Sequence, residues 1–271
     1  MERQVTLTFE VQPLRFEFKA KEPVRFPPGK AANTLRGALG LVLSQRVFEP
    51  KPDSHPSGLA DSPRPFVFRA RHLDGQTINP GQSFHFEINL FNPGLAQAFI
   101  EAFKTMGHKG LGANRTRIEF LQAIRSDPIT LNLSPTSNTS KQIRVHFITP
   151  IELKHESRIV TRPEFPILFG RIRDRISTLR RLYGAGPLDF DYQASNNRSA
   201  AIRMTACDLR REETHRRSSR TGQTHSIGGL IGSADYEGDL AEFLPWLQAA
   251  KWTGVGRQCV WGKGETEVEF R

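Results

Sequence analysis

The chain has 271 residues, of which 38 are Lys or Arg and 28 are Asp or Glu, giving a formal net charge of +10. This balance predicts a polyanionic partner, and 37% hydrophobic with 24% charged residues is typical of a globular protein. Two cysteines without a CxxC pair exclude a zinc knuckle and a disulfide framework. The charged, alternating start and the lack of a long apolar run predict no signal peptide, no membrane span and a cytoplasmic location.

The first half of the chain begins with a strand-like alternation, in which Val5, Leu7, Phe9 and Val11 are separated by polar residues. The same periodicities predict the elements that follow: a helix with an apolar stripe from Leu35 to Leu43, strands at 65–71 and 84–90, a helix at 93–106 capped by Asn92, and a strand at 115–125. This order is strand-helix-strand-strand-helix-strand.

The second half repeats that order after a segment rich in Ser, Thr, Asn and Pro, which predicts a linker over 127–142. Its predicted elements are a strand from Ile143, a long helix at 165–183, strands at 199–211 and 226–236, a helix capped by Asp239, and a last strand at 260–270. Each half is therefore βαββαβ, which predicts an α+β protein of two tandem ferredoxin-like domains, 1–126 and 143–271.

In the C-terminal domain this topology places three connections at one end of the sheet. They hold His155 and Arg158, then the hairpin 212–225, then the loop 254–264. The hairpin region is rich in guanidinium groups, which match phosphate geometry and predict RNA contacts; its candidates are Arg210, Arg211, Arg216, Arg217, Arg220 and, beside them, His225. The alternative is a solvated loop without a ligand.

The last connection, GVGRQCVWGKG, is rich in glycine and basic residues. Glycine lets backbone N–H groups approach a phosphate, so the candidate RNA contacts are Gly254, Gly256, Gly262 and Gly264, with Arg257 and Lys263 adding charge. Because the loop precedes a strand, it matches neither a Walker loop nor a dinucleotide fingerprint, and we expect no cofactor. A tight turn without function is the alternative. The polar face of the long helix (Arg171, Arg173, Arg175, Arg180 and Arg181) would extend the RNA track or be solvated.

Several segments together resemble the CRISPR repeat-processing endoribonucleases of the RAMP superfamily. They are LRGALG (35–40), PRPFVFRA (63–70), PGQSFHFEINLF (80–91), GHKGLGANRTRIEF (107–120), FITPIELK (147–154), SSRTGQTHSIGGLIGSADYEG (218–238) and the terminal GVGRQCVWGKGETEVEF. The likeness covers essentially the whole chain. It implies two tandem ferredoxin-like domains and binding of repeat RNA as a stem-loop or short single strand. It also implies cleavage by 2′-hydroxyl attack, which leaves a 2′,3′-cyclic phosphate without a metal.

Many members of that family carry a catalytic histidine in or just after the first helix, where this chain has none within 30–46. The candidates for proton transfer are therefore His155, in the first connection, His55, in the loop after the helix, and His225, in the hairpin region. Lys30 and Arg36 would supply positive charge in a histidine-poor site. The alternatives are a non-catalytic RAMP subunit that holds guide RNA among other CRISPR effector subunits, and an unrelated basic RNA-binding module.

Overall fold

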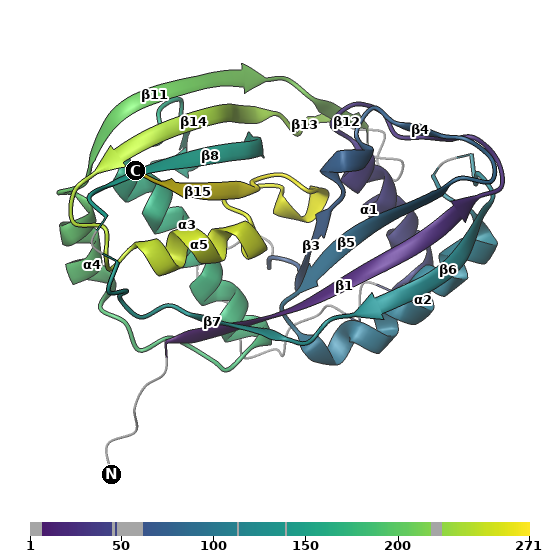
Figure 1. Ribbon diagram of the computed structural model, residues 1–271, viewed down its shortest axis with the longest axis horizontal. Coiled ribbons are helices and arrows are strands. Elements are labelled where there is room, and N and C mark those ends of the chain that lie inside the picture. Colours follow the sequence, from purple (N-terminus) through teal and green to yellow (C-terminus); the bar gives the residue numbers. More distant parts are fainter. Residues whose placement is uncertain (1–6, 45–46, 48–61, 113, 139, 218–223) are drawn as a thin grey trace, which may run out of the picture. The chain divides into compact units, whose positions relative to one another are not determined.

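The computed structural model describes residues 7–44, 47, 62–112, 114–138, 140–217 and 224–271 (Figure 1). The chain divides into two compact units. The N-terminal unit comprises Glu10–Ile129 with Val260–Gly262, and the C-terminal unit comprises Met1–Phe9, Thr130–Cys259 and Lys263–Arg271.

The N-terminal unit is built on an antiparallel sheet in the order β3-β5-β1-β6. Its elements are β1 (Thr8–Ala20), β2 (Val24–Arg25), α1 (Ala31–Val42), β3 (Phe66–Arg69), η3 (Arg71–Leu73), β4 (Thr77–Ile78), β5 (Ser83–Leu90), η4 (Pro93–Leu95), α2 (Ala96–Lys109) and β6 (Ile118–Arg125). The short strands β2 and β4 pair with each other. If these four strands are numbered 1 to 4 along the chain, their order across the sheet is 2-3-1-4.

The C-terminal unit has the same arrangement, with the sheet order β11-β14-β8-β15. Its elements are β8 (Gln142–Ile151), β9 (Lys154–His155), β10 (Arg158–Ile159), α3 (Phe165–Tyr183), α4 (Tyr192–Ser199), β11 (Arg203–Glu212), β12 (His215–Arg217), β13 (Thr224–Ser226), β14 (Gly229–Glu237), α5 (Leu244–Thr253), η5 (Cys259–Trp261) and β15 (Thr266–Phe270). The predicted tandem ferredoxin-like fold is confirmed, because both sheets have the strand order of that fold.

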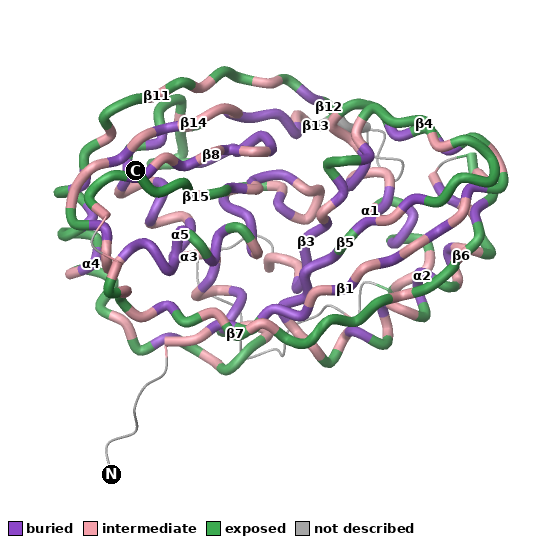
Figure 2. The backbone as a smooth tube through the Cα atoms, viewed as in Figure 1, coloured by how far each residue is buried: buried purple, intermediate pink, exposed green. Residues whose placement is uncertain are grey.

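Phenylalanine rings fill the core of the N-terminal unit. On β1, Phe16 and Phe18 are fully buried, whereas Arg15 and Glu17, which alternate with them, are only partly buried. Figure 2 shows how burial varies along the chain. The ring centroid of Phe16 lies 4.3 Å from that of Phe103 on α2, so strand and helix interlock through aromatic contacts. Strand β1 runs on to Ala20, well beyond Val11, the last of the residues that predicted it. Its burial alternation changes phase after Val11: Phe9 and Val11 are buried in one phase, and the even-numbered residues from Gln12 to Ala20 are buried in the other.

Two residues were predicted to cap the start of a helix, Asn92 and Asp239, and only Asn92 does so. The Oδ1 of Asn92 accepts a hydrogen bond from the N–H of Gly94 at 3.1 Å, so its predicted capping role is confirmed. The prediction for Asp239 was wrong. Helix α5 begins only at Leu244, and the Asp239 carboxylate lies 3.7 Å from Lys141 instead.

Two further segments differ from the prediction: the predicted linker contains a strand, and the last strand starts later. Within the predicted linker, β7 (Ile129–Asn132) pairs with β1, and the N–H of Leu133 donates to the carbonyl of Leu7 at 2.7 Å. The alternating apolar residues of this segment explain its pairing. The last strand begins at Thr266 rather than at 260, because η5 and the glycines after it form turns.

The predicted RNA-facing arginines of α3 are largely structural. Arg173 and Arg180 are buried, at 6% and 9% exposure. The guanidinium of Arg180 donates to the carbonyls of Thr8, Gly186 and Pro187 at 2.6–2.7 Å. The prediction was wrong for both arginines, because periodicity alone does not separate a solvated cation from one that satisfies buried carbonyls.

Replacement of Arg180 by Met tests this role. We expect Arg180→Met to lower the free energy of unfolding by roughly 3 kcal/mol, because three carbonyls lose their donor. Urea denaturation measures the change. The matched control is Arg181→Met on the exposed side of the same helix, which we expect to stay within about 0.5 kcal/mol of the wild type. Equal losses in the two variants would contradict the assignment.

Candidate functional site

Two of the three connections at one end of the C-terminal unit are joined by Glu152 and Arg257. The N–H of Arg257 donates to the Glu152 carbonyl at 2.9 Å, and its Nη1 lies 2.6 Å from the Glu152 Oε1. The Glu152 side chain is only 5% exposed. A carboxylate buried to this degree needs such a partner, so the pair holds the end of β8 against the glycine-rich loop.

The basic hairpin joins the same end. Gln258 Nε2 donates to the carbonyl of Ser226 at 2.9 Å, which connects the glycine-rich loop to β13. At the base of the hairpin the N–H of Ile227 donates to the carbonyl of Thr214 at 2.7 Å. The predicted gathering of the three connections is therefore confirmed by contacts within this unit.

The four glycines of the last connection all have positive φ, between +70° and +80°. A Cβ at Gly256 would lie 2.6 Å from the Glu152 carbonyl oxygen, so only glycine fits there. The N–H of Gly254 donates to Ala250 and that of Gly264 to Pro150, at 2.8 and 3.0 Å. These two N–H groups are therefore already used within the unit, and the phosphate contacts expected of Gly254 and Gly264 stay predictions.

The two basic residues of this loop have different environments. Arg257 is 53% exposed, so its guanidinium pairs with Glu152 and still reaches solvent. Lys263 is 3% exposed and lies in the interior. The RNA contact expected of Lys263 stays a prediction, whereas Arg257 keeps an exposed edge for an anion.

His155 and Arg158 face each other across a small hairpin that periodicity did not predict. They are paired residues of β9 and β10, joined by Glu156 and Ser157, whose φ angles are +47° and +65°. Two consecutive left-handed residues are the mark of a tight two-residue hairpin. The His155 ring is 52% exposed, and its Nε2 lies 3.9 Å from the Glu156 carboxylate, too far for a hydrogen bond.

His155 also lines a pocket of about 390 Å³ beside α3. Its other lining residues are Pro166, Ile167, Gly170, Arg171, Arg173, Asp174 and Asn196. The Arg173 guanidinium is fixed by Asn196 Oδ1 at 2.8 Å and by Asp174 Oδ1 at 2.7 Å. An apolar wall beside fixed polar groups suits a planar, polar ligand group.

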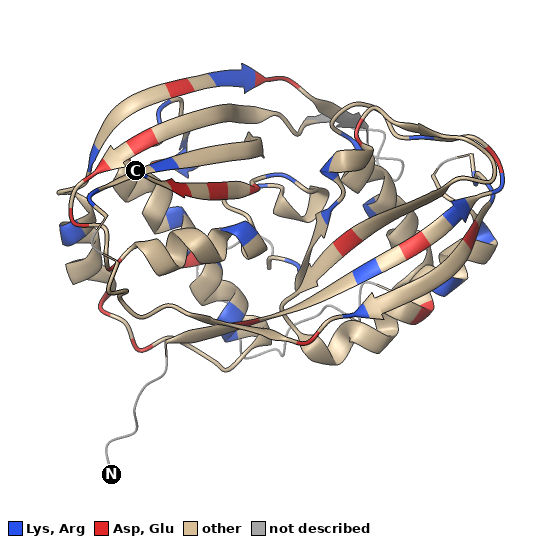
Figure 3. Ribbon diagram, viewed as in Figure 1, with Lys and Arg blue, Asp and Glu red and all other residues tan. Residues whose placement is uncertain are grey.

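The predicted arginines of the hairpin occupy several positions. Arg210 and Arg211 are exposed near the end of β11, where Figure 3 shows a basic segment, and Arg211 pairs with Glu213 at 2.5 Å. Arg216 and Arg217 belong to β12, and Arg216 pairs through its backbone with His225. Arg220 lies outside the described residues.

The remaining candidates belong to the N-terminal unit. Lys30 is half-buried at the N-cap of α1, and Arg36 is half-buried within that helix. His55 lies outside the described residues. Helix α1 itself contains no histidine.

Three other histidines have partners within the chain. His146 hydrogen-bonds Glu269 at 2.8 Å, and this bond lowers the pKa of Glu269. The ring of His85 stacks on that of His72 at 4.6 Å, and burial, reinforced by Arg15 and His72, lowers the pKa of His85. Among the described residues, no group of three His, Cys, Asp or Glu side chains could hold a metal ion. None of the helices there is long and apolar enough to cross a membrane.

Residues 145–266 match the family model of the CRISPR-associated endoribonuclease Cas6, and residues 44–144 match a second model described as an N-terminal domain. The C-terminal unit is of the Cas6 type. The resemblance drawn from the sequence is confirmed, because the matching family is that of the CRISPR-associated endoribonucleases. The Cas6 match includes all three gathered connections.

Solved Cas6 structures have the same fold. A product complex of Cas6 (TTHA0078) is 16% identical with a TM-score of 0.59, and the match covers 96% of this chain and 100% of that chain. Thermus thermophilus Cas6 (TTHB231) is 13% identical with a TM-score of 0.57, over 96% and 98%. A partial Cas6-RT-Cas1–Cas2 complex is 12% identical with a TM-score of 0.61, over 99% of this chain and 47% of that chain. No curated protein sequence matches the chain.

Gly256→Ala tests whether backbone geometry requires glycine in the loop. We expect the free energy of unfolding to fall by about 1–3 kcal/mol. An alanine here would have to adopt a positive φ, and its Cβ would collide with the Glu152 carbonyl oxygen. The control Gly170→Ala, within α3 and with open space at its Cβ, should gain about 0.5–1 kcal/mol. Chemical denaturation of both variants measures the difference, and a neutral Gly256→Ala would refute the requirement.

Proposed function

We propose that this protein binds CRISPR repeat RNA and cleaves it by metal-independent 2′-hydroxyl attack to produce mature guide RNA. The observation that carries the proposal is the Cas6 match over 145–266, which spans the gathered connections. A similar Cas6 is described as a product complex. Cytoplasmic location and association with other CRISPR subunits belong to the same proposal, and a similar chain belongs to a Cas6-RT-Cas1–Cas2 complex.

The exposed guanidinium groups at this end of the C-terminal unit support RNA binding. Arg158 and Arg257 come from two of the connections, Arg210 lies near the end of β11 before the third, and all three reach solvent. Guanidinium groups bind phosphate oxygens with two parallel hydrogen bonds, so they would contact the backbone of the RNA. The pocket beside His155 would take the base of a nucleotide near the cut.

The proposed step needs only proton transfer and positive charge. The ribose 2′-oxygen attacks the adjacent phosphorus and the bond from phosphorus to the 5′-oxygen breaks. One group takes the 2′-hydroxyl proton and another protonates the 5′-oxygen, so the products are a 2′,3′-cyclic phosphate and a 5′-hydroxyl. We assign one of these proton transfers to His155, with Arg158 placed opposite it to stabilise the charge on phosphorus.

Cleavage in EDTA tests the metal-independent reaction. Repeat RNA from the CRISPR array of the source organism, incubated with the protein and excess EDTA, should be cut once per repeat. We expect the upstream product to carry a 2′,3′-cyclic phosphate, which phosphatase does not remove until acid opens the ring. Cleavage that requires added divalent cations, or a 3′-hydroxyl end, would refute the mechanism.

His155→Ala tests the assigned histidine. We expect the single-turnover cleavage rate to fall by roughly a hundredfold, while RNA affinity changes less than about threefold, because a proton-transfer group is lost without a phosphate contact. The matched control is His146→Ala, a partly exposed histidine that bonds Glu269. Unchanged cutting by His155→Ala would remove this residue from the mechanism.

A non-catalytic RAMP subunit that holds guide RNA is the second candidate. It is favoured by helix α1, which spans Ala31–Val42 without a histidine. Such a subunit would bind repeat RNA and leave it intact under every condition of the EDTA experiment.

A further inference from the structure

The N-terminal unit repeats the glycine-rich turn that follows the second helix of the C-terminal unit. Residues 110–112 (Gly-Leu-Gly) follow α2, and residues 254–256 (Gly-Val-Gly) follow α5. The glycine φ angles are +84° and +74° in the first turn and +70° and +80° in the second. In each turn the first glycine donates its N–H to the carbonyl four residues earlier, at 2.9 and 2.8 Å, and the apolar residue between the glycines is buried.

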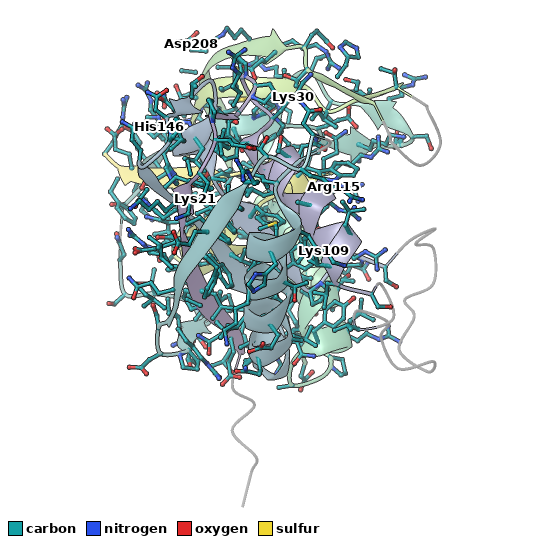
Figure 4. The ribbon with its side chains drawn as sticks, turned by 90° about the vertical axis from the view of Figure 1, so that its right-hand side faces the viewer. Lys21, Lys30, Lys109, Arg115, His146 and Asp208 are labelled. Carbon is teal, nitrogen blue, oxygen red and sulfur yellow. The ribbon has the colours of Figure 1, made fainter. Side chains whose placement is uncertain are left out.

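The turn in the N-terminal unit presents Arg115 beside helix α1. A Cβ at Gly110 would collide with the Arg115 carbonyl, and Arg115 itself has a φ of +50°. The Cβ position of Gly112 lies 3.8 Å from the Thr34 methyl group on the first turn of α1. Figure 4 shows Lys30, Arg115 and Lys109 along this flank of the unit.

The cations on this flank lack carboxylate partners. Within the described part of the chain, Lys30, Lys109 and Arg115 form no ion pair, and the latter two are exposed. Their neighbours are paired: Lys104 lies 2.8 Å from Glu101, and Arg117 lies 2.7 Å from Glu22. The exposed charges of Lys109 and Arg115 are therefore not neutralised by a carboxylate within the described part of this unit, at the place where the glycine turn meets α1.

We propose that Lys109 and Arg115, with Lys30 beside them, form a second RNA-backbone contact in the N-terminal unit. This inference rests on the proposed function and adds a binding site to it. The three cations come from the start of α1, the end of α2 and the following turn, so they would meet successive phosphates of a polymer rather than enclose one small anion. Such contacts carry no base specificity.

The double variant Lys109→Ala/Arg115→Ala tests the site. Its control is Lys104→Ala/Arg117→Ala, which removes the same charge from the same unit but at ion-paired positions. Affinity for repeat RNA and for an oligouridylate of equal length is measured over a series of salt concentrations. We expect the test variant to bind both RNAs roughly tenfold more weakly, with a salt dependence flatter by about 1.4 in log–log slope, since each lost phosphate contact contributes about 0.7. The control should keep the wild-type slope.

Equal slopes and affinities for the test and control variants would overturn the second site while leaving the proposed function intact. A wild-type protein that binds neither RNA would overturn both. Melting temperatures of all variants are compared with the wild type, and Lys109→Gln/Arg115→Gln, which keeps polar side chains at both positions, replaces the alanine pair if that pair unfolds.

Discussion

The ion pair between Glu152 and Arg257 is the constraint on which the candidate site depends. A carboxylate that is 5% exposed is costly to bury alone, and here the Arg257 guanidinium pairs with it while the N–H of Arg257 donates to the main-chain carbonyl of Glu152. The pair fixes Glu152, which lies two residues before the start of β9 and three residues before His155. It also positions Gln258, which reaches the hairpin at Ser226. This pair is thus one of the bonds that hold together the connections that the proposed reaction needs.

The glycines around this pair are required by the backbone geometry of the loop, whether or not a ligand is bound. Gly256 lies against the Glu152 carbonyl, and the N–H groups of Gly254 and Gly264 donate hydrogen bonds to carbonyls within the unit. Recognition of phosphate at this loop would therefore fall to side chains such as Arg257. The same turn in the N-terminal unit follows the same logic, because its glycines shape the turn and its cations remain exposed. A turn retained in both units for its geometry thus gives each unit a place for basic side chains.

The two sheets were predictable from the sequence. Each half shows the same order of strand-like and helix-like patterns, and the right-handed crossover rule leaves few strand arrangements for that order. Asn92 was predictable for a local reason, since its side chain caps the turn that it starts. Helix α4 escaped prediction because Tyr192–Ser199 buries only Ser195 and Ser199 and has no apolar stripe. The burial of Arg180 and Lys263 could not be seen either, because it depends on long-range acceptors and packing that no pattern of residue types records.

The turn between β9 and β10 distinguishes His155 from the other histidines. Glu156 and Ser157 both adopt left-handed backbone conformations that cost energy for residues other than glycine. A Gly in either position would relieve that cost, yet the chain holds His155 opposite Arg158 with this strained turn. His146, in contrast, sits on a regular strand with a carboxylate partner. Strain of this kind persists where the surrounding structure enforces it and is concentrated at functional sites, which supports His155 as the group that moves a proton in the proposed reaction.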